Sequence, residues 1–125
     1  MATSAEAVVL LGHDSRLAGG TCGLEPVAAR VAALLGGARV EEAFLQLAQP
    51  NLDEAVARCV AAGAERIVVV PFFLFPGAHV QEDIPQALER LAAVYPRVTL
   101  HLAEVLGGHP KLAEVAAERA REALP

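Results

Sequence analysis

Two of the four histidines, His13 and His79, each follow a strongly apolar segment of the chain, at 7–12 and 66–73. Neutral imidazole binds divalent cobalt, iron, nickel, zinc and copper ions, and it also accepts a proton near neutral pH. If the two segments are neighbouring parallel strands, they lie about 4.8 Å apart, and both imidazoles can face one cavity. The pair therefore indicates a metal site or a proton-transfer site. The alternative is that either histidine only caps a loop or satisfies backbone groups.

Other kinds of site lack their sequence motifs. The residues GHDSR at 12–16 form neither a GxGxxG dinucleotide motif nor a GxxxxGK[ST] phosphate loop, and HExxH does not occur. Ser15 does not lie in a GxSxG nucleophile elbow. His101 lies inside a predicted strand, where a structural role is favoured, and His109 precedes Pro110, where it is expected to act as a helix N-cap. The first two histidines are thus the strongest candidates.

The composition predicts one compact domain over residues 1–125. Hydrophobic residues make up 54% of the chain and the mean hydropathy is +0.42, which is too apolar for disorder. A net charge of −5 with no basic stripe excludes nucleic acid as an expected partner. No apolar stretch approaches the roughly 20 residues of a membrane span, and the start lacks the basic region of a signal peptide. Two cysteines form no disulfide framework, so we expect a cytoplasmic protein.

Strand and helix signals alternate four times along the chain. Apolar or β-branched runs predict strands at 7–12, 39–47, 66–73 and 98–105. The second run is less apolar and is expected near an edge, the third is expected centrally, and Pro71 is expected to end the third or to form a bulge.

Residues at helical spacing between the strands predict four helices. The second is expected to begin at a capping box of Asn51 and Glu54. The third is expected to begin at or near Asp83, with Pro85 in its first turn, and the last at Pro110. The apolar stripes expected to face inward are Leu24, Val27, Ala28, Val31, Leu34 and Leu35 in the first helix, Leu52, Ala55, Val56, Cys59 and Val60 in the second, and Leu112, Val115 and Ala116 in the last.

This alternation predicts an α/β fold with an open four-stranded parallel sheet and helices on both faces. Right-handed crossovers favour the flavodoxin-like strand order 2-1-3-4. A crevice is then expected at the carboxyl ends of strands 1 and 3, where such folds bind ligands. His13 and His79 are expected at this crevice.

The sequence resembles the small CbiX-type chelatases, single-domain members of the class II chelatase group, and the likeness spans nearly the whole chain. The motifs that carry it are VLLGHDSR at 9–16, FL at 44–45 followed by Pro50, VVVPFFL at 68–74, GAHVQEDIP at 77–85 and LGGHP at 106–110.

The resemblance implies a single chelatase domain over 1–125 that inserts a divalent metal, Co²⁺ foremost and Fe²⁺ second, into sirohydrochlorin for cobalamin or sirohaem biosynthesis. The metal is then a substrate, no organic cofactor is expected, and family members pair as homodimers. By this likeness His13 is the metal ligand and proton acceptor, and His79 is the second metal ligand. The residues implied to bind the macrocycle are Ser15, Arg16, Gln46, Leu74, Phe75, Pro76, Gly77 and Ala78.

Two positions depart from the family pattern. Asp14 stands where the family usually has glycine, and Gln46 stands where many relatives carry a carboxylate. An amide binds metals less well than a carboxylate and accepts no proton. These departures keep a second hypothesis open, in which the chain is a non-catalytic tetrapyrrole- or metal-binding protein of the same fold. A third hypothesis is an α/β interaction domain whose two crevice histidines hold no ligand.

Overall fold

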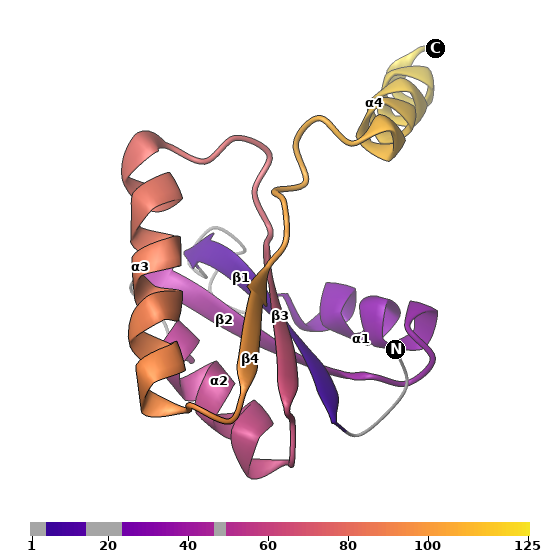
Figure 1. The fold of residues 1–125 in the computed structure, drawn as a ribbon. Helices are drawn as coiled ribbons and strands as arrows, with labels where there is room; N and C mark the ends of the chain where they lie inside the picture. The colour runs from indigo at the N-terminus through magenta and orange to yellow at the C-terminus, as the bar shows by residue number, and fades with distance from the viewer. Residues whose placement is uncertain (1–4, 15–23, 47–49) are drawn as a thin grey trace.

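The computed structural model describes residues 5–14, 24–46 and 50–125 (Figure 1). In this part of the chain four parallel strands form one sheet in the order β2-β1-β3-β4, which confirms the predicted fold class and strand order. The strands are β1 (Glu6–Asp14), β2 (Arg39–Gln46), β3 (Arg66–Pro71) and β4 (Thr99–Leu102). The helices are α1 (Glu25–Leu34), α2 (Leu52–Ala61), α3 (Ala78–Val94) and α4 (Pro110–Ala123).

Strand ends differ from the predicted ones in ways that matter for the site. β1 continues beyond residue 12, since Gly12 and Asp14 still pair with β2, so His13 lies within the strand and not after it. β3 ends at Pro71, as expected of a residue without an N–H, and not at residue 73. β4 ends at Leu102 and is shorter than the predicted 98–105; beyond it, Ala103 still donates a backbone hydrogen bond to the Val69 carbonyl (2.9 Å).

The core lies between the sheet and two helices. Figure 1 shows α2 and α3 against one face of the sheet and α1 against the other. Alternate residues of the two central strands point into the α2–α3 layer and are fully buried, as expected for strands in the middle of a sheet. The largest of these side chains are Val9, Leu11, Ile67 and Val69.

Helix α2 follows the prediction closely. Asn51 accepts a hydrogen bond from the backbone N–H of Glu54 (2.9 Å), and the Glu54 carboxylate accepts one from the Asn51 N–H (2.9 Å), which completes the capping box. Cys59 is fully buried, and this burial raises the pKa of its thiol to about 11. The thiol therefore stays protonated and serves as a small core residue.

Helix α3 begins earlier than predicted, at Ala78 and not near Asp83. Val80 lies one turn before the buried Ile84 and packs against the core, so continuing the helix back to this point buries further apolar surface. Pro85 consequently lies inside the helix, on its exposed side, and costs it one backbone hydrogen bond. The result for the site is that His79 lies in the first turn of a helix.

Contrary to the prediction, helix α4 does not pack inward. All its residues are described and none of them is buried; Val115 is 47% exposed. Figure 1 shows α4 leading away from the sheet at its carboxyl edge. In the connection before the helix, Leu106 donates a backbone hydrogen bond to the Phe73 carbonyl (3.1 Å), so this connection runs beside the segment after β3.

Leu34 of α1 was also expected to face inward and is 86% exposed. The half-buried side of that helix includes Val31 and Leu35, and Leu34 lies about a quarter-turn from it.

Among the described residues, no helix is both long enough and apolar enough to cross a lipid bilayer.

Candidate functional site

His13 and His79 line one cavity of about 390 Å³ at the carboxyl edge of the sheet. His13 comes from the end of β1, and His79 comes from the first turn of α3. Both side chains are exposed, so an ion in solution can reach either ring. The other residues that line the cavity are Phe73, Phe75, Pro76, Gly77, Ala78 and Val80.

The position of His13 follows from the pairing of β1 with β3. This pairing continues past Pro71, because Phe72 donates a backbone hydrogen bond to the Leu11 carbonyl (2.8 Å). Phe73 therefore arrives beside His13, and the two rings meet edge to face with centroids 6.1 Å apart and planes at 74°. Phe73 also packs partly against the core. One side of the His13 imidazole thus contacts an aromatic ring with a defined position.

The position of His79 follows from the start of α3. Gly77 is the N-cap, and its carbonyl accepts the Gln81 N–H (3.1 Å), which closes the first helical turn. This turn places His79 at the cavity that His13 also lines.

Two imidazoles can hold a divalent ion and leave its other coordination positions open. Among the described residues, no group of three or more His, Cys, Asp or Glu side chains comes close enough to hold a metal ion.

Large apolar side chains stand in solvent beside the histidines. Phe75 is 87% exposed and Leu74 is 53% exposed. Exposed apolar groups beside a cavity mark a surface that takes up an apolar partner.

The remaining predicted site residues divide into three groups. Phe75, Pro76, Gly77 and Ala78 line the histidine cavity, whereas Leu74 adjoins it without lining it. Gln46 ends β2 and pairs with Asp14 of β1, so its backbone lies at the same edge of the sheet as His13. Ser15 and Arg16 lie outside the described residues.

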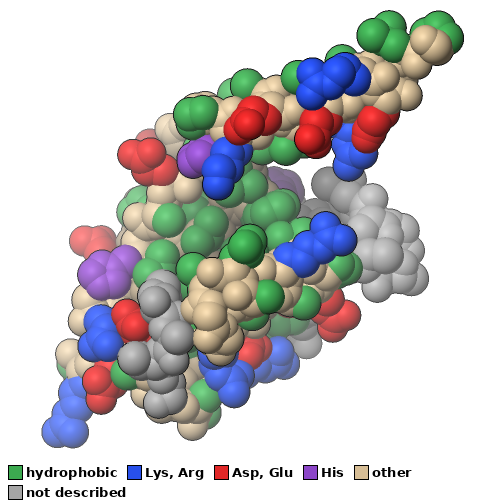
Figure 2. Space-filling model, turned by 90° about the vertical axis from the view of Figure 1, so that its right-hand side faces the viewer, with side chains coloured by type: hydrophobic (Ala, Val, Ile, Leu, Met, Phe, Trp, Pro, Cys, Tyr) green, Lys and Arg blue, Asp and Glu red, His purple; other side chains and the backbone are tan. Residues whose placement is uncertain are grey.

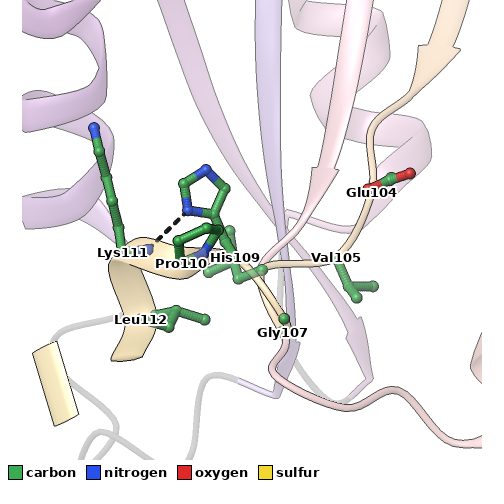
Figure 3. A pocket seen from close by; sticks show the side chains of 9 residues that line it. Glu104, Val105, Gly107, His109, Pro110, Lys111 and Leu112 are labelled. Carbon is green, nitrogen blue, oxygen red and sulfur yellow. Dashed lines mark hydrogen bonds between the residues drawn. The ribbon is translucent and has the colours of Figure 1, made fainter. Parts of the chain in front are cut away.

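Sequence reasoning missed a hollow that continues from this cavity. A second cavity of about 430 Å³ shares Pro76 and Val80 with the first, and it also reaches Glu104, Val105 and Gly107. These last three residues line a third cavity of about 680 Å³ at the start of α4, shown in Figure 3. The only available signal was the LGGHP motif at 106–110.

His109 has the structural role that the sequence predicts. Its Nδ1 accepts the backbone N–H of Lys111 (3.1 Å) and caps α4 (Figure 3). Lys111 and Glu104 lie on opposite sides of this pocket in the same view. The hollow therefore carries charges of both signs near an apolar lining.

Comparisons with known proteins bear on this arrangement. A family model described as CbiX matches residues 7–123. The chain is 33% identical over 120 residues to a chloroplastic sirohydrochlorin ferrochelatase of Arabidopsis thaliana, covering 96% of this chain and 53% of the plant protein. It is also 33% identical over 138 residues to a sirohydrochlorin cobaltochelatase of Methanopyrus kandleri, covering 94% of this chain and 96% of that protein.

A solved structure with a similar fold is the sirohydrochlorin chelatase SirB of Bacillus subtilis subspecies spizizenii in complex with cobalt. It superposes with a TM-score of 0.76 at 26% identity, covering 94% of this chain and 50% of that one. The chain thus spans about half the length of the plant and Bacillus relatives and nearly all of the Methanopyrus relative.

Proposed function

Because the CbiX model matches nearly its whole length, the chain belongs to the CbiX family, and we propose that it inserts a divalent metal ion into sirohydrochlorin. Co²⁺ is the first choice of metal and Fe²⁺ the second, in line with the cobaltochelatase and ferrochelatase relatives. The observation that carries the proposal is the pair of exposed imidazoles on one cavity. Residues 1–125 would act as one chelatase domain without an organic cofactor, and the expected cytoplasmic location stays a prediction.

Metal insertion makes three demands. The ion must lose water, two pyrrole N–H groups must lose their protons, and the ring must lie against the ion. His13 and His79 are proposed to take the ion while leaving coordination positions free for the ring nitrogens. His13, when it is not bound to metal, is also proposed to accept one of the two ring protons, because imidazole accepts protons near neutral pH, and the other proton passes to water.

The flat ring needs an apolar surface, and its carboxylates need a cation and hydrogen-bond donors. The exposed side chains of Leu74 and Phe75 would provide the first, with Pro76, Gly77 and Ala78 forming the adjoining wall. A net charge of −5 opposes an anionic substrate at long range, so local groups must bind the carboxylates. We assign this role to Arg16, Ser15 and Gln46.

The second candidate function is binding without turnover. It is favoured by Asp14 and Gln46, which replace a glycine and a carboxylate of the family pattern. Such a protein would keep the metal or the tetrapyrrole without accelerating insertion.

We also propose that the chain works as a homodimer. Val115 on α4 and Leu124 beyond it are 47% and 70% exposed. Figure 2 shows hydrophobic side chains gathered in the hollow between α4 and the rest of the molecule. A second copy could cover these surfaces and would bring the assembly to the length of the plant and Bacillus relatives.

One assay separates the two functions. Purified protein is mixed with sirohydrochlorin and Co²⁺, and insertion is followed by absorption spectroscopy. The enzyme accelerates insertion over the protein-free rate, His13→Ala abolishes the acceleration, and His101→Ala, which removes an exposed imidazole on β4, preserves it. Tight binding without acceleration would establish the second function, and failure to bind either metal or ring would exclude both.

A further inference from the structure

The connection between β4 and α4 contacts the segment that leads from β3 to the histidine cavity. Leu106 donates its backbone N–H to the carbonyl of Phe73 (3.1 Å). Next to it, Gly107 lies directly against the backbone of Leu74. A Cβ at position 107 would overlap the Leu74 carbonyl oxygen and would lie 2.8 Å from the carbonyl carbon.

This contact requires glycine because of space and not because of backbone conformation. Gly63 has a φ of +97°, yet no described atom lies within 4 Å of a Cβ built there. At position 107 no positive φ is involved, and the obstacle is backbone, which cannot rotate away as a side chain can. Any side chain at this position must push the two segments apart.

The two residues that make this contact lead directly to the site. Phe73, whose carbonyl accepts the Leu106 hydrogen bond, packs its ring against His13. Leu74, whose carbonyl touches Gly107, is followed by the residues Phe75 to Ala78 that line the cavity before His79. Displacement of this segment would change the distance between the two imidazoles.

We propose that Gly107 is a positioning residue, which holds the segment after β3 so that His13 and His79 face one metal ion. The proposal rests on the proposed function of the cavity. It assigns Gly107 no contact with metal or macrocycle. Its effect passes through the Leu74 backbone.

The test is Gly107→Ala, with Co²⁺ affinity measured by titration calorimetry and KM for sirohydrochlorin measured by absorption. We expect Co²⁺ affinity to fall about 10- to 100-fold, the usual loss when a supporting partner of a metal site is removed, and KM to rise. The matched control is Gly63→Ala, which strains a turn between α2 and β3 and lowers Tm without changing either quantity. A Gly107→Ala protein that loses thermal stability but keeps both values would overturn the proposal.

A measurement on the unaltered chain keeps the proposal testable if this variant does not fold. Co²⁺ should slow hydrogen exchange of the Leu106 amide, because that amide is bonded to the residue that contacts His13. The Thr99 amide, bonded to Glu65 (2.8 Å) at the start of β4, is the reference. Equal slowing of the two amides would contradict the proposal.

The outcomes also separate this proposal from the proposed function. A wild-type chain that binds Co²⁺ without inserting it refutes the enzyme, while the effect of Gly107→Ala on affinity still decides the role of Gly107. A wild-type chain that binds no Co²⁺ refutes both.

Discussion

Helices α2 and α4 carry similar apolar stripes and have opposite environments. Four of the ten residues of α2 are buried against the sheet, whereas none of the fourteen residues of α4, all of them described, is buried. Each helix has an N-cap, supplied by Asn51 in α2 and by His109 in α4. Local capping is therefore common to both, and tertiary packing distinguishes them.

The difference in burial between α2 and α4 indicates which helix contributes more to the stability of the fold. Burying an apolar side chain contributes about 1.5–3 kcal/mol, so α2 adds several such contributions to the core. An isolated helix of the length of α4 is marginal in water. The layer of α2 on the sheet therefore contributes stability through burial, whereas α4 contributes little of it.

The largest expected effect comes from paired truncations of the two helices. Leu52→Ala should lower the free energy of unfolding by about 2–5 kcal/mol, because it leaves a cavity in a packed layer. Leu112→Ala, at a half-buried position of α4, should cost much less at concentrations where the protein is monomeric. Urea denaturation of both variants measures the contrast. Equal losses would show that α4 packs on its own chain in solution.

The second prediction concerns the carboxyl edge. His79→Ala should weaken Co²⁺ binding at least about 10- to 100-fold, since losing a ligand costs no less than losing a supporting partner. Thermal unfolding should be unchanged because the side chain is exposed. His101→Ala serves as the control in the same titration. An unaltered Co²⁺ affinity in His79→Ala would remove His79 from the site.

The third prediction tests what covers α4. Val115→Asp should weaken a dimer by about tenfold or more, because it buries an unpaired charge in the interface. Ala117→Asp adds the same charge about half a turn around the helix and should have little effect. Sedimentation velocity over a range of concentrations distinguishes the two. A chain that sediments as a monomer at every concentration contradicts the homodimer.

Local signals in the sequence predicted much of the fold. The strand order follows from alternation and crossover handedness, and the caps at Asn51 and His109 follow from residue type and position. The sequence did not indicate the start of α3, because a proline normally lies in the first turn of a helix. In the structure the burial of Val80 outweighs the backbone hydrogen bond that Pro85 removes from the helix.

The placement of α4 and of the hollow beside the site could not be predicted. A helical stripe is the same whether it packs on its own sheet or on another surface. Before α4 begins, Leu106 and Gly107 contact the segment after β3, which lies more than thirty residues earlier, and no local pattern signals such a contact. The two histidines could be brought together from strand order alone, but the cavities lined by residues 102–112 depend on that remote contact.

The smallest expected effect concerns the ion pair between α2 and α3, the two helices that pack on one face of the sheet. Arg90 of α3 donates two hydrogen bonds to the Asp53 carboxylate of α2 (2.7 and 3.1 Å), and these bonds hold the pKa of that carboxyl below its ordinary value. A lowered pKa in the folded state adds stability above the unfolded pKa of about 3.9, and this stability is lost as the pH falls through the folded value. Arg90→Gln should therefore lower Tm slightly at pH 7, and the difference from wild type should vanish in acid.

The size of this effect is limited by solvent. The side chains of Arg90 and Asp53 are 57% and 49% exposed, so water and salt screen the pair. Adding salt at pH 7 should shrink the difference in Tm between Arg90→Gln and wild type. If the difference survives in both high salt and acid, the role of Arg90 is packing of its aliphatic stem between α3 and α2 and not the ion pair. In either case the change should leave Co²⁺ affinity untouched, because Arg90 lies about three helical turns from His79 along α3.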